Sequence, residues 1–141
     1  MSDYVEYFLP EFKSSKHPAI SPMPVIRDLE LSWCDRSESF QLPLVKVDCG
    51  ADYSALPKEW ALMASMHGVR LRTVEIELPD GDLSTFYYFM MRYKIPRVMK
   101  DWGVAGFLVM NEYLIGRNIL KNFVVTLNGP DELLTISNPT P

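Results

Sequence analysis

The chain of 141 residues is poor in the side chains that build metal and nucleotide sites. It contains two cysteines and two histidines, and the spacings of Cys34 from Cys49 and of His17 from His67 match none of the common four-ligand zinc patterns. It also lacks a glycine-rich phosphate loop and a GxGxxG fingerprint. The sequence therefore predicts no metal site and no bound cofactor.

Basic charge and long apolar runs are scarce as well. Lys and Arg number 14 against 18 Asp and Glu, so the formal net charge is -4 and no basic stripe is available to neutralise phosphates. The longest apolar stretches, residues 86–91 and 104–110, are too short to span a bilayer, and the N-terminus does not resemble a signal peptide. With the cysteines interpreted as reduced thiols, we expect a cytoplasmic protein that binds neither nucleic acid nor membrane.

Nucleophilic catalysis by serine or cysteine has little support in the sequence. There is no GxSxG elbow. His17 lies in a proline-rich stretch and His67 precedes Gly68 at the predicted end of a helix, so both are interpreted as surface histidines rather than general bases. Any hydrolytic chemistry in this chain would therefore have to rest on carboxylates.

The composition that is present, 48% hydrophobic over 141 residues, is enough for one domain with its own core. Residues 1–24 are set apart by prolines at positions 10, 18, 22 and 24, which disfavour helix interiors and central strands. We interpret this segment as an N-terminal arm, extended or partly disordered, and residues 25–141 as the folded domain.

Short apolar–polar alternations dominate the domain and predict β-strands. These lie at residues 25–31, 41–47, 71–78, 83–91, 104–110, 113–115, 123–127 and 133–137. Helices are predicted only at residues 54–66 and 117–122. The turns at residues 79–82 and 128–131 each join two strands into a hairpin. The pattern favours a mainly β domain, barrel-like or sandwich-like.

Residues 86–91 form an aromatic and methionine run within one predicted strand. Alternation sends Phe86, Tyr88 and Met90 to one face of the strand and the intervening residues to the other. Packing in the core or between subunits is the expected use of these side chains, and lining of a substrate pocket is the alternative.

One acidic segment has the composition of a catalytic site. A largely apolar strand at residues 44–47 runs into Asp48, Cys49 and Gly50. A carboxylate at the end of a buried strand costs desolvation unless hydrogen bonds compensate, and Gly50 permits a sharp turn that brings backbone N–H groups close. Taken alone, this three-residue pattern is interpreted as an ordinary turn at a strand end.

A second segment changes that interpretation. Residues 113–120 read Tyr-Leu-Ile-Gly-Arg-Asn-Ile-Leu, an apolar triplet before glycine, then Arg-Asn, then apolar residues at helical spacing. With Asp-Cys-Gly-Ala at residues 48–51 and the predicted hairpin between the two segments, the chain resembles the retropepsin-like aspartic proteases, the family of retroviral proteases and their bacterial and cellular relatives. The resemblance covers about residues 25–137.

The resemblance implies a retropepsin-like acid-protease barrel with a flap hairpin and one or two short helices, one lobe per chain. It implies that Asp48 is the catalytic aspartate and that the site forms in a homodimer, where each subunit supplies one Asp48. The implied function is an aspartic endopeptidase that hydrolyses a peptide or polyprotein substrate. Two carboxyls activate the attacking water, so no metal or other cofactor is needed.

Further positions take roles from the same resemblance. Asp52 matches the family's second acid, which holds substrate backbone and pairs with the arginine found here as Arg117. The residues that support the active site are Cys49, Gly50, Ala51, Asp52, Ser54, Gly116, Arg117 and Asn118. The flap consists of Leu78, Pro79, Asp80, Gly81, Asp82 and Leu83. Residues 133–137 resemble the C-terminal strand that builds the dimer interface.

Cys49 departs from the family, which has Thr or Ser at this position. In the family that hydroxyl forms a hydrogen bond across the dimer axis, and a thiol is a weaker donor and acceptor. Three outcomes stay open: an active enzyme whose dimer is held less rigidly, an inactive protein, or redox control through two Cys49 thiols. The alternative function is therefore a catalytically weak or inactive dimer of the same fold that binds peptides or proteins, although the retained Asp48 favours the enzyme.

Overall fold

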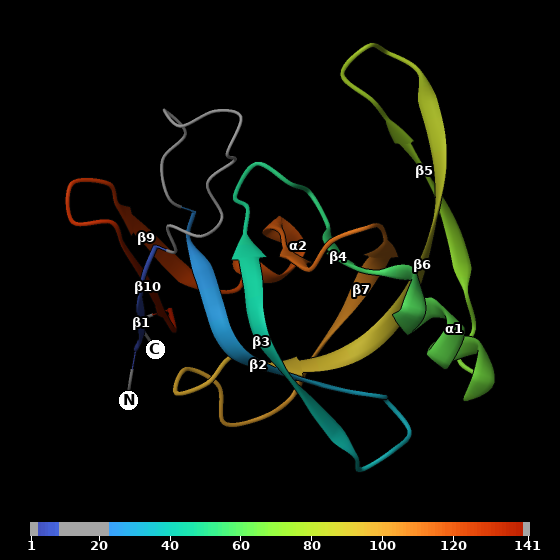
Figure 1. Cartoon of the computed structure of the whole chain (residues 1–141), viewed down its shortest axis with the longest axis horizontal. Helices are drawn as coiled ribbons and strands as arrows, with labels where there is room; N and C mark the ends of the chain where they lie inside the picture. Colours follow the sequence, from blue (N-terminus) through green and yellow to red (C-terminus); the bar gives the residue numbers. More distant parts are fainter. Residues whose placement is uncertain (1–2, 9–22, 140–141) are drawn as a thin grey trace.

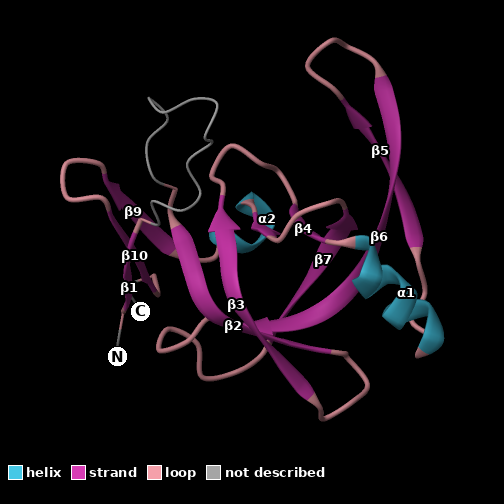
Figure 2. Cartoon of the chain, viewed as in Figure 1, coloured by secondary structure: helices cyan, strands magenta, loops and turns pink. Residues whose placement is uncertain are grey.

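The structure is a computed structural model that describes residues 3–8 and 23–139, and its architecture is mainly β (Figure 2). The strands are β1 (Tyr4–Tyr7), β2 (Val25–Ser32), β3 (Ser39–Val47), β4 (Ser54–Leu56), β5 (Arg72–Glu77), β6 (Leu83–Lys94), β7 (Gly103–Val109), β8 (Leu114–Ile115), β9 (Val124–Asn128) and β10 (Leu133–Ser137). The helices are α1 (Lys58–Met66) and α2 (Arg117–Leu120). Neither helix in this part of the chain is long and apolar enough to cross a membrane.

Six strands form a nearly closed ring (Figure 1). Their order is β2-β3-β8-β4-β7-β6, and the last strand returns to the first because Leu31 of β2 pairs with Tyr93 of β6. Most neighbours are antiparallel, but β3 with β8 and β4 with β7 are parallel. The prediction of a mainly β domain is confirmed, and its barrel-like character takes the form of this incomplete ring.

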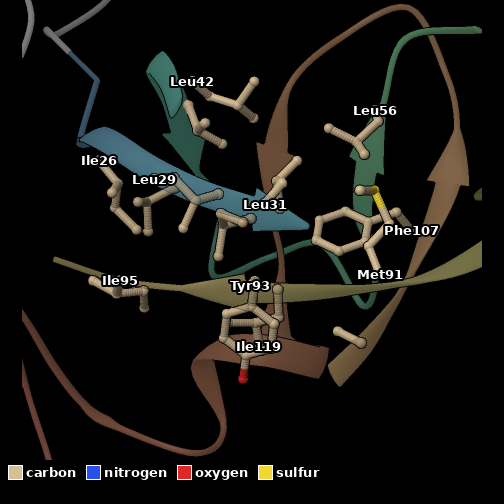
Figure 3. Packing of buried hydrophobic residues seen from close by; sticks show 14 of the residues in the cluster. Ile26, Leu29, Leu31, Leu42, Leu56, Met91, Tyr93, Ile95, Phe107 and Ile119 are labelled. Carbon is tan, nitrogen blue, oxygen red and sulfur yellow. The ribbon is translucent and has the colours of Figure 1, made fainter. Parts of the chain in front are cut away.

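The main core fills the ring. Strand alternation sends Leu29 and Leu31 of β2 inward against Met91 of β6 and Phe107 of β7, as Figure 3 shows. All four side chains are fully buried, as is Ile119 of α2, and burial of each contributes about 1.5–3 kcal/mol to folding. The core therefore fixes the strands of the ring and α2 relative to one another.

The predicted strands are confirmed, with shifts of at most three residues at either end. The predicted helix at residues 54–66 is wrong at its start, because Ser54–Leu56 form β4 and the helix begins at Lys58. Ala55 and Leu56 pair in parallel with β7, and all three residues of β4 are buried. Long-range pairing and burial outweigh the local helix propensity there. The second predicted helix, at residues 117–122, ends earlier, at Leu120.

A second sheet has the order β1-β10-β9 and packs beside the ring. Its first strand lies within residues 1–24, the segment interpreted as an arm, and residues 9–22 of that segment lie outside the described residues. Tyr4 of β1 is 1% exposed and belongs to the main core. Its hydroxyl accepts a hydrogen bond from the Arg27 backbone N–H at 2.6 Å, which ties β1 to β2.

The pKa of Tyr4 is raised to about 12, chiefly by burial and to a smaller extent by the neighbouring Glu6 carboxylate, while the hydrogen bond from the Arg27 N–H opposes the shift. An unfolded tyrosine has a pKa of about 10, so the neutral Tyr4 stabilises the fold below that pH, and this contribution is lost as the pH rises through about 12.

We expect the free energy of unfolding, measured with urea between pH 8 and pH 12, to fall less steeply in Tyr4→Phe than in the native chain. Tyr7→Phe, at an exposed position of the same strand, should keep the native slope. An unchanged slope in Tyr4→Phe would contradict this assignment.

Candidate functional site

Asp48 lies where β3 leaves the ring beside β8. The preceding residue, Val47, pairs in parallel with Ile115, and the Asp48 N–H donates to the Ile115 carbonyl at 2.9 Å. Asp48 Oδ1 accepts a hydrogen bond from the Gly50 N–H at 2.9 Å, and the Asp48 carbonyl accepts one from the Ala51 N–H at 3.2 Å. The expected turn therefore forms, and it holds the partly buried carboxylate by one oxygen.

The loop after Asp48 is fastened to the segment that opens α2. The Arg117 N–H donates to the Ala51 carbonyl at 2.8 Å, and the Asn118 N–H donates to the Asp52 carbonyl at 3.1 Å. Gly116 lies so close to this loop that an added Cβ would be 2.4 Å from the carbonyl oxygen of Tyr53. Only glycine fits at this position.

Ser54, which is buried, and Asn118, which is partly buried, form a polar network beneath the loop. The Ser54 hydroxyl and N–H each donate to Asn118 Oδ1 at 2.8 Å. The Ser54 hydroxyl also accepts from the Gly116 N–H at 3.0 Å, and Asn118 Nδ2 donates to the Gly106 carbonyl at 2.9 Å. One amide side chain thus joins β4 and β7 to the start of α2.

Replacing Asn118 by alanine is expected to lower the free energy of unfolding by about 3 kcal/mol, because it leaves three hydrogen-bonding groups without this partner inside the fold. Urea unfolding at neutral pH measures this loss. Asn111→Ala, at an exposed position in the same region of the chain, is the matched control and should change stability by less than about 0.5 kcal/mol. Equal effects of the two substitutions would show that the network does not hold the loop.

The expected pair between Arg117 and Asp52 forms, with a guanidinium nitrogen against Asp52 Oδ1. Both side chains are more than half exposed, so the pair contributes at most about 1 kcal/mol to stability. Cys49 stands beside Asp48 as an exposed free thiol, and Cys34 is also exposed and free. The single chain therefore leaves the Cys49 thiol accessible at the same turn as the carboxylate.

A second apolar cluster lies next to the loop. Its buried members are Ala55, Leu108 and Leu114, and its partly buried members are Ala51, Val74, Ile76, Phe86, Tyr88 and Met110. Alternation along β6 predicted that Phe86 and Tyr88 share a face, and this is confirmed, since Phe89 and Met91 belong to the main core instead. The sequence did not predict which residues of β4, β5, β7 and β8 join this cluster, because only the tertiary pairing of these strands brings them together.

Two hollows open at this cluster. One, of about 290 Å³, is lined by Tyr53, Thr73, Val74, Tyr88, Met90, Gly106, Leu108 and Asn118, none of which carries a formal charge at neutral pH. The other, more open and of about 540 Å³, is lined by Lys58, Phe86, Val109, Met110, Asn111 and Glu112. The smaller hollow, beside Tyr53, can therefore accept apolar groups, and the larger one has the charged residues Lys58 and Glu112 in its wall.

The residues expected to form a flap, 78–83, lie at the tip of the β5–β6 hairpin. The Leu78 N–H donates to the Asp82 carbonyl at 2.7 Å, and the Gly81 N–H donates to the Leu78 carbonyl at 2.9 Å. Gly81 has a φ of 89°, a conformation that favours glycine. Figure 1 shows the tip of this hairpin standing clear of the loop that follows β3.

Residues 133–137, which resemble an interface strand, have no free edge within the chain. β10 pairs with β1 on one side, with Val5 opposite Thr135, and with β9 on the other, with Thr126 opposite Thr135. A second copy could not pair with β10 without displacing one of these strands.

Comparisons with models of protein families, with curated proteins and with solved structures find no match for this chain. The residues and their geometry therefore carry the functional proposal.

Proposed function

We propose that this chain is one half of a homodimeric aspartic endopeptidase with a retropepsin-like fold. One observation carries the proposal: two sequence motifs far apart in the chain form one locked loop that presents the carboxylate of Asp48. The hydrogen bonds from the Arg117 N–H to the Ala51 carbonyl and from the Ser54 N–H to Asn118 Oδ1 make this junction. The strand ring, the hairpin with the flap and the adjacent apolar cluster support the same function.

The chemistry requires a second carboxyl group. One carboxylate takes a proton from water, whose oxygen attacks the peptide carbonyl, while a protonated carboxyl donates its proton to that carbonyl oxygen. Two carboxyls held close share one proton, which supplies both forms at once, and aspartic proteases are the general example of this arrangement. Because each chain offers one Asp48 at such a turn, a two-fold axis would supply the partner.

The proposed substrate is an extended peptide with apolar side chains. No charged residue of the described part of the chain lines the hollow of about 290 Å³ beside Tyr53 and Asn118, which suits an aliphatic or aromatic side chain. Backbone groups of the flap would add hydrogen bonds along the peptide when the hairpin closes over it.

A non-catalytic peptide-binding dimer is the second candidate, and Cys49 favours it. A thiol forms a weaker hydrogen bond than the hydroxyl that would hold the paired turns rigid. The apolar hollow could still bind a peptide without cleaving it.

Incubation of the native chain with a diverse peptide mixture, in reductant and from about pH 4 to about pH 7, tests the proposal. We expect new peptide ends with apolar neighbours, detected by mass spectrometry, and none from the Asp48→Asn variant run in parallel. Products that are the same in both samples would overturn the proposal, because cleavage would not depend on Asp48. No products from a sample shown to be dimeric would favour the binding dimer. Cys49→Thr would then show whether the hydroxyl restores cleavage.

A further inference from the structure

Three strands of the described chain pair on one side only: β1, β5 and β9. Open edges are usually protected by charged side chains, because an unprotected row of backbone N–H and C=O groups recruits other strands. β5 carries Arg72, Glu75 and Glu77. β1 carries Glu6, which pairs with Arg27 of β2 at 3.3 Å. Both of these edges are therefore protected.

The edge of β9 has no such protection. Its sequence, Val-Val-Thr-Leu-Asn, contains neither charge nor proline and is rich in β-branched residues, which favour strand pairing. Val124 is 50% exposed and Leu127 is 47% exposed. β10 pairs with a strand on each side, so among the residues that the structure describes β9 is the one strand of this sheet with an uncharged open edge.

We propose that β9 pairs antiparallel with β9 of a second copy of this chain, so that the two three-stranded sheets become one six-stranded sheet. The inference rests on the proposed function for its need of a second copy, and it names the surface at which that copy binds. Full overlap of the five residues places Thr126 opposite the partner's Thr126 and Val124 opposite the partner's Asn128. Such self-pairing closes around a two-fold axis.

The charges at the two ends of β9 fit this orientation. Lys121 precedes the strand, and Asp131 and Glu132 follow it; no ion pair involves any of the three within the described residues. Antiparallel pairing brings Lys121 toward the partner's turn at residues 128–132 at both ends of the seam. Parallel pairing would instead place like charges together.

Sedimentation of the native chain and of Thr126→Lys, over about a hundredfold range of concentration, tests the pairing. Thr126 is exposed, so lysine is compatible with the monomer, but two lysines would face each other across the seam. We expect the native chain to dimerise and Thr126→Lys to dimerise at least about tenfold more weakly. Ser65→Lys, the same charge change at an exposed position of α1, should dimerise like the native chain. A mixture of Thr126→Lys with Thr126→Glu should regain the dimer.

A native chain that stays monomeric, a Thr126→Lys variant that dimerises as well as the native chain, or a mixture that does not recover would overturn the inference. Thr126→Cys, in a chain whose Cys34 and Cys49 are serine, gives a second measurement if the lysine variant fails to fold. Oxidation should link two copies through residue 126, identified by mass spectrometry, and a folded chain that forms no such link counts against the pairing. A β9-paired dimer without peptide cleavage would refute the proposed function alone, whereas cleavage by a dimer insensitive to Thr126→Lys would refute this inference alone.

Discussion

Replacing Asp48 by asparagine is expected to lower the rate of peptide cleavage by at least about 10³-fold. Asparagine keeps an oxygen that can accept the hydrogen bond from the Gly50 N–H, so the turn is preserved. It can neither take a proton from the attacking water nor donate one to the peptide carbonyl. Because each subunit of the proposed dimer carries the change, both carboxyls are removed at once.

The measurement is the initial rate of appearance of a defined product, with urea unfolding of each variant to show that the fold is kept. Asp101→Asn, which removes one exposed carboxylate from the loop before β7, is the matched control and should retain the native rate. If Asp48→Asn cleaves as fast as this control, Asp48 is not the catalytic acid and the proposed function fails.

Gly116→Ala is expected to destabilise the chain by about 3 kcal/mol or more, or to prevent folding. An added Cβ would lie 2.4 Å from the Tyr53 carbonyl oxygen, 2.6 Å from its carbon and 2.9 Å from the Ala51 carbonyl oxygen. These are backbone atoms, so no side-chain rotation relieves the overlap. Movement of the loop would break the hydrogen bond from Arg117 to Ala51 and carry the turn of Asp48 with it.

Urea unfolding of Gly116→Ala beside Gly129→Ala isolates the steric effect. Gly129 lies in the β9–β10 turn, and an added Cβ there would meet no atom within 4 Å. The control is therefore expected to stay within about 1 kcal/mol of the native chain. Equal stability of the two variants would mean that the close approach between the loop and α2 is not required for folding.

The strands and turns of this protein were predictable because their signals are local. Alternation alone placed the strand at residues 133–137, and turn composition alone placed the hairpin around residues 79–82. The turn at Asp48 was predictable for the same reason, because Gly50 follows the acid by two positions and the turn forms within this one short segment. Gly116 was also identified from the sequence, but the close contact with Tyr53 that requires glycine at this position was not.

The tertiary structure decided which segments meet. Ser54–Leu56 have helix-favouring neighbours, yet they become a buried strand because β7 and β8 lie beside them. The network of Ser54 with Asn118, the apolar cluster around Leu108 and the open edge of β9 depend on residues far apart in the chain. Periodicity describes one segment at a time. The sequence therefore determined the local elements and the candidate carboxylate. Long-range pairing and burial decided which residues surround that carboxylate and which strand edge stays open.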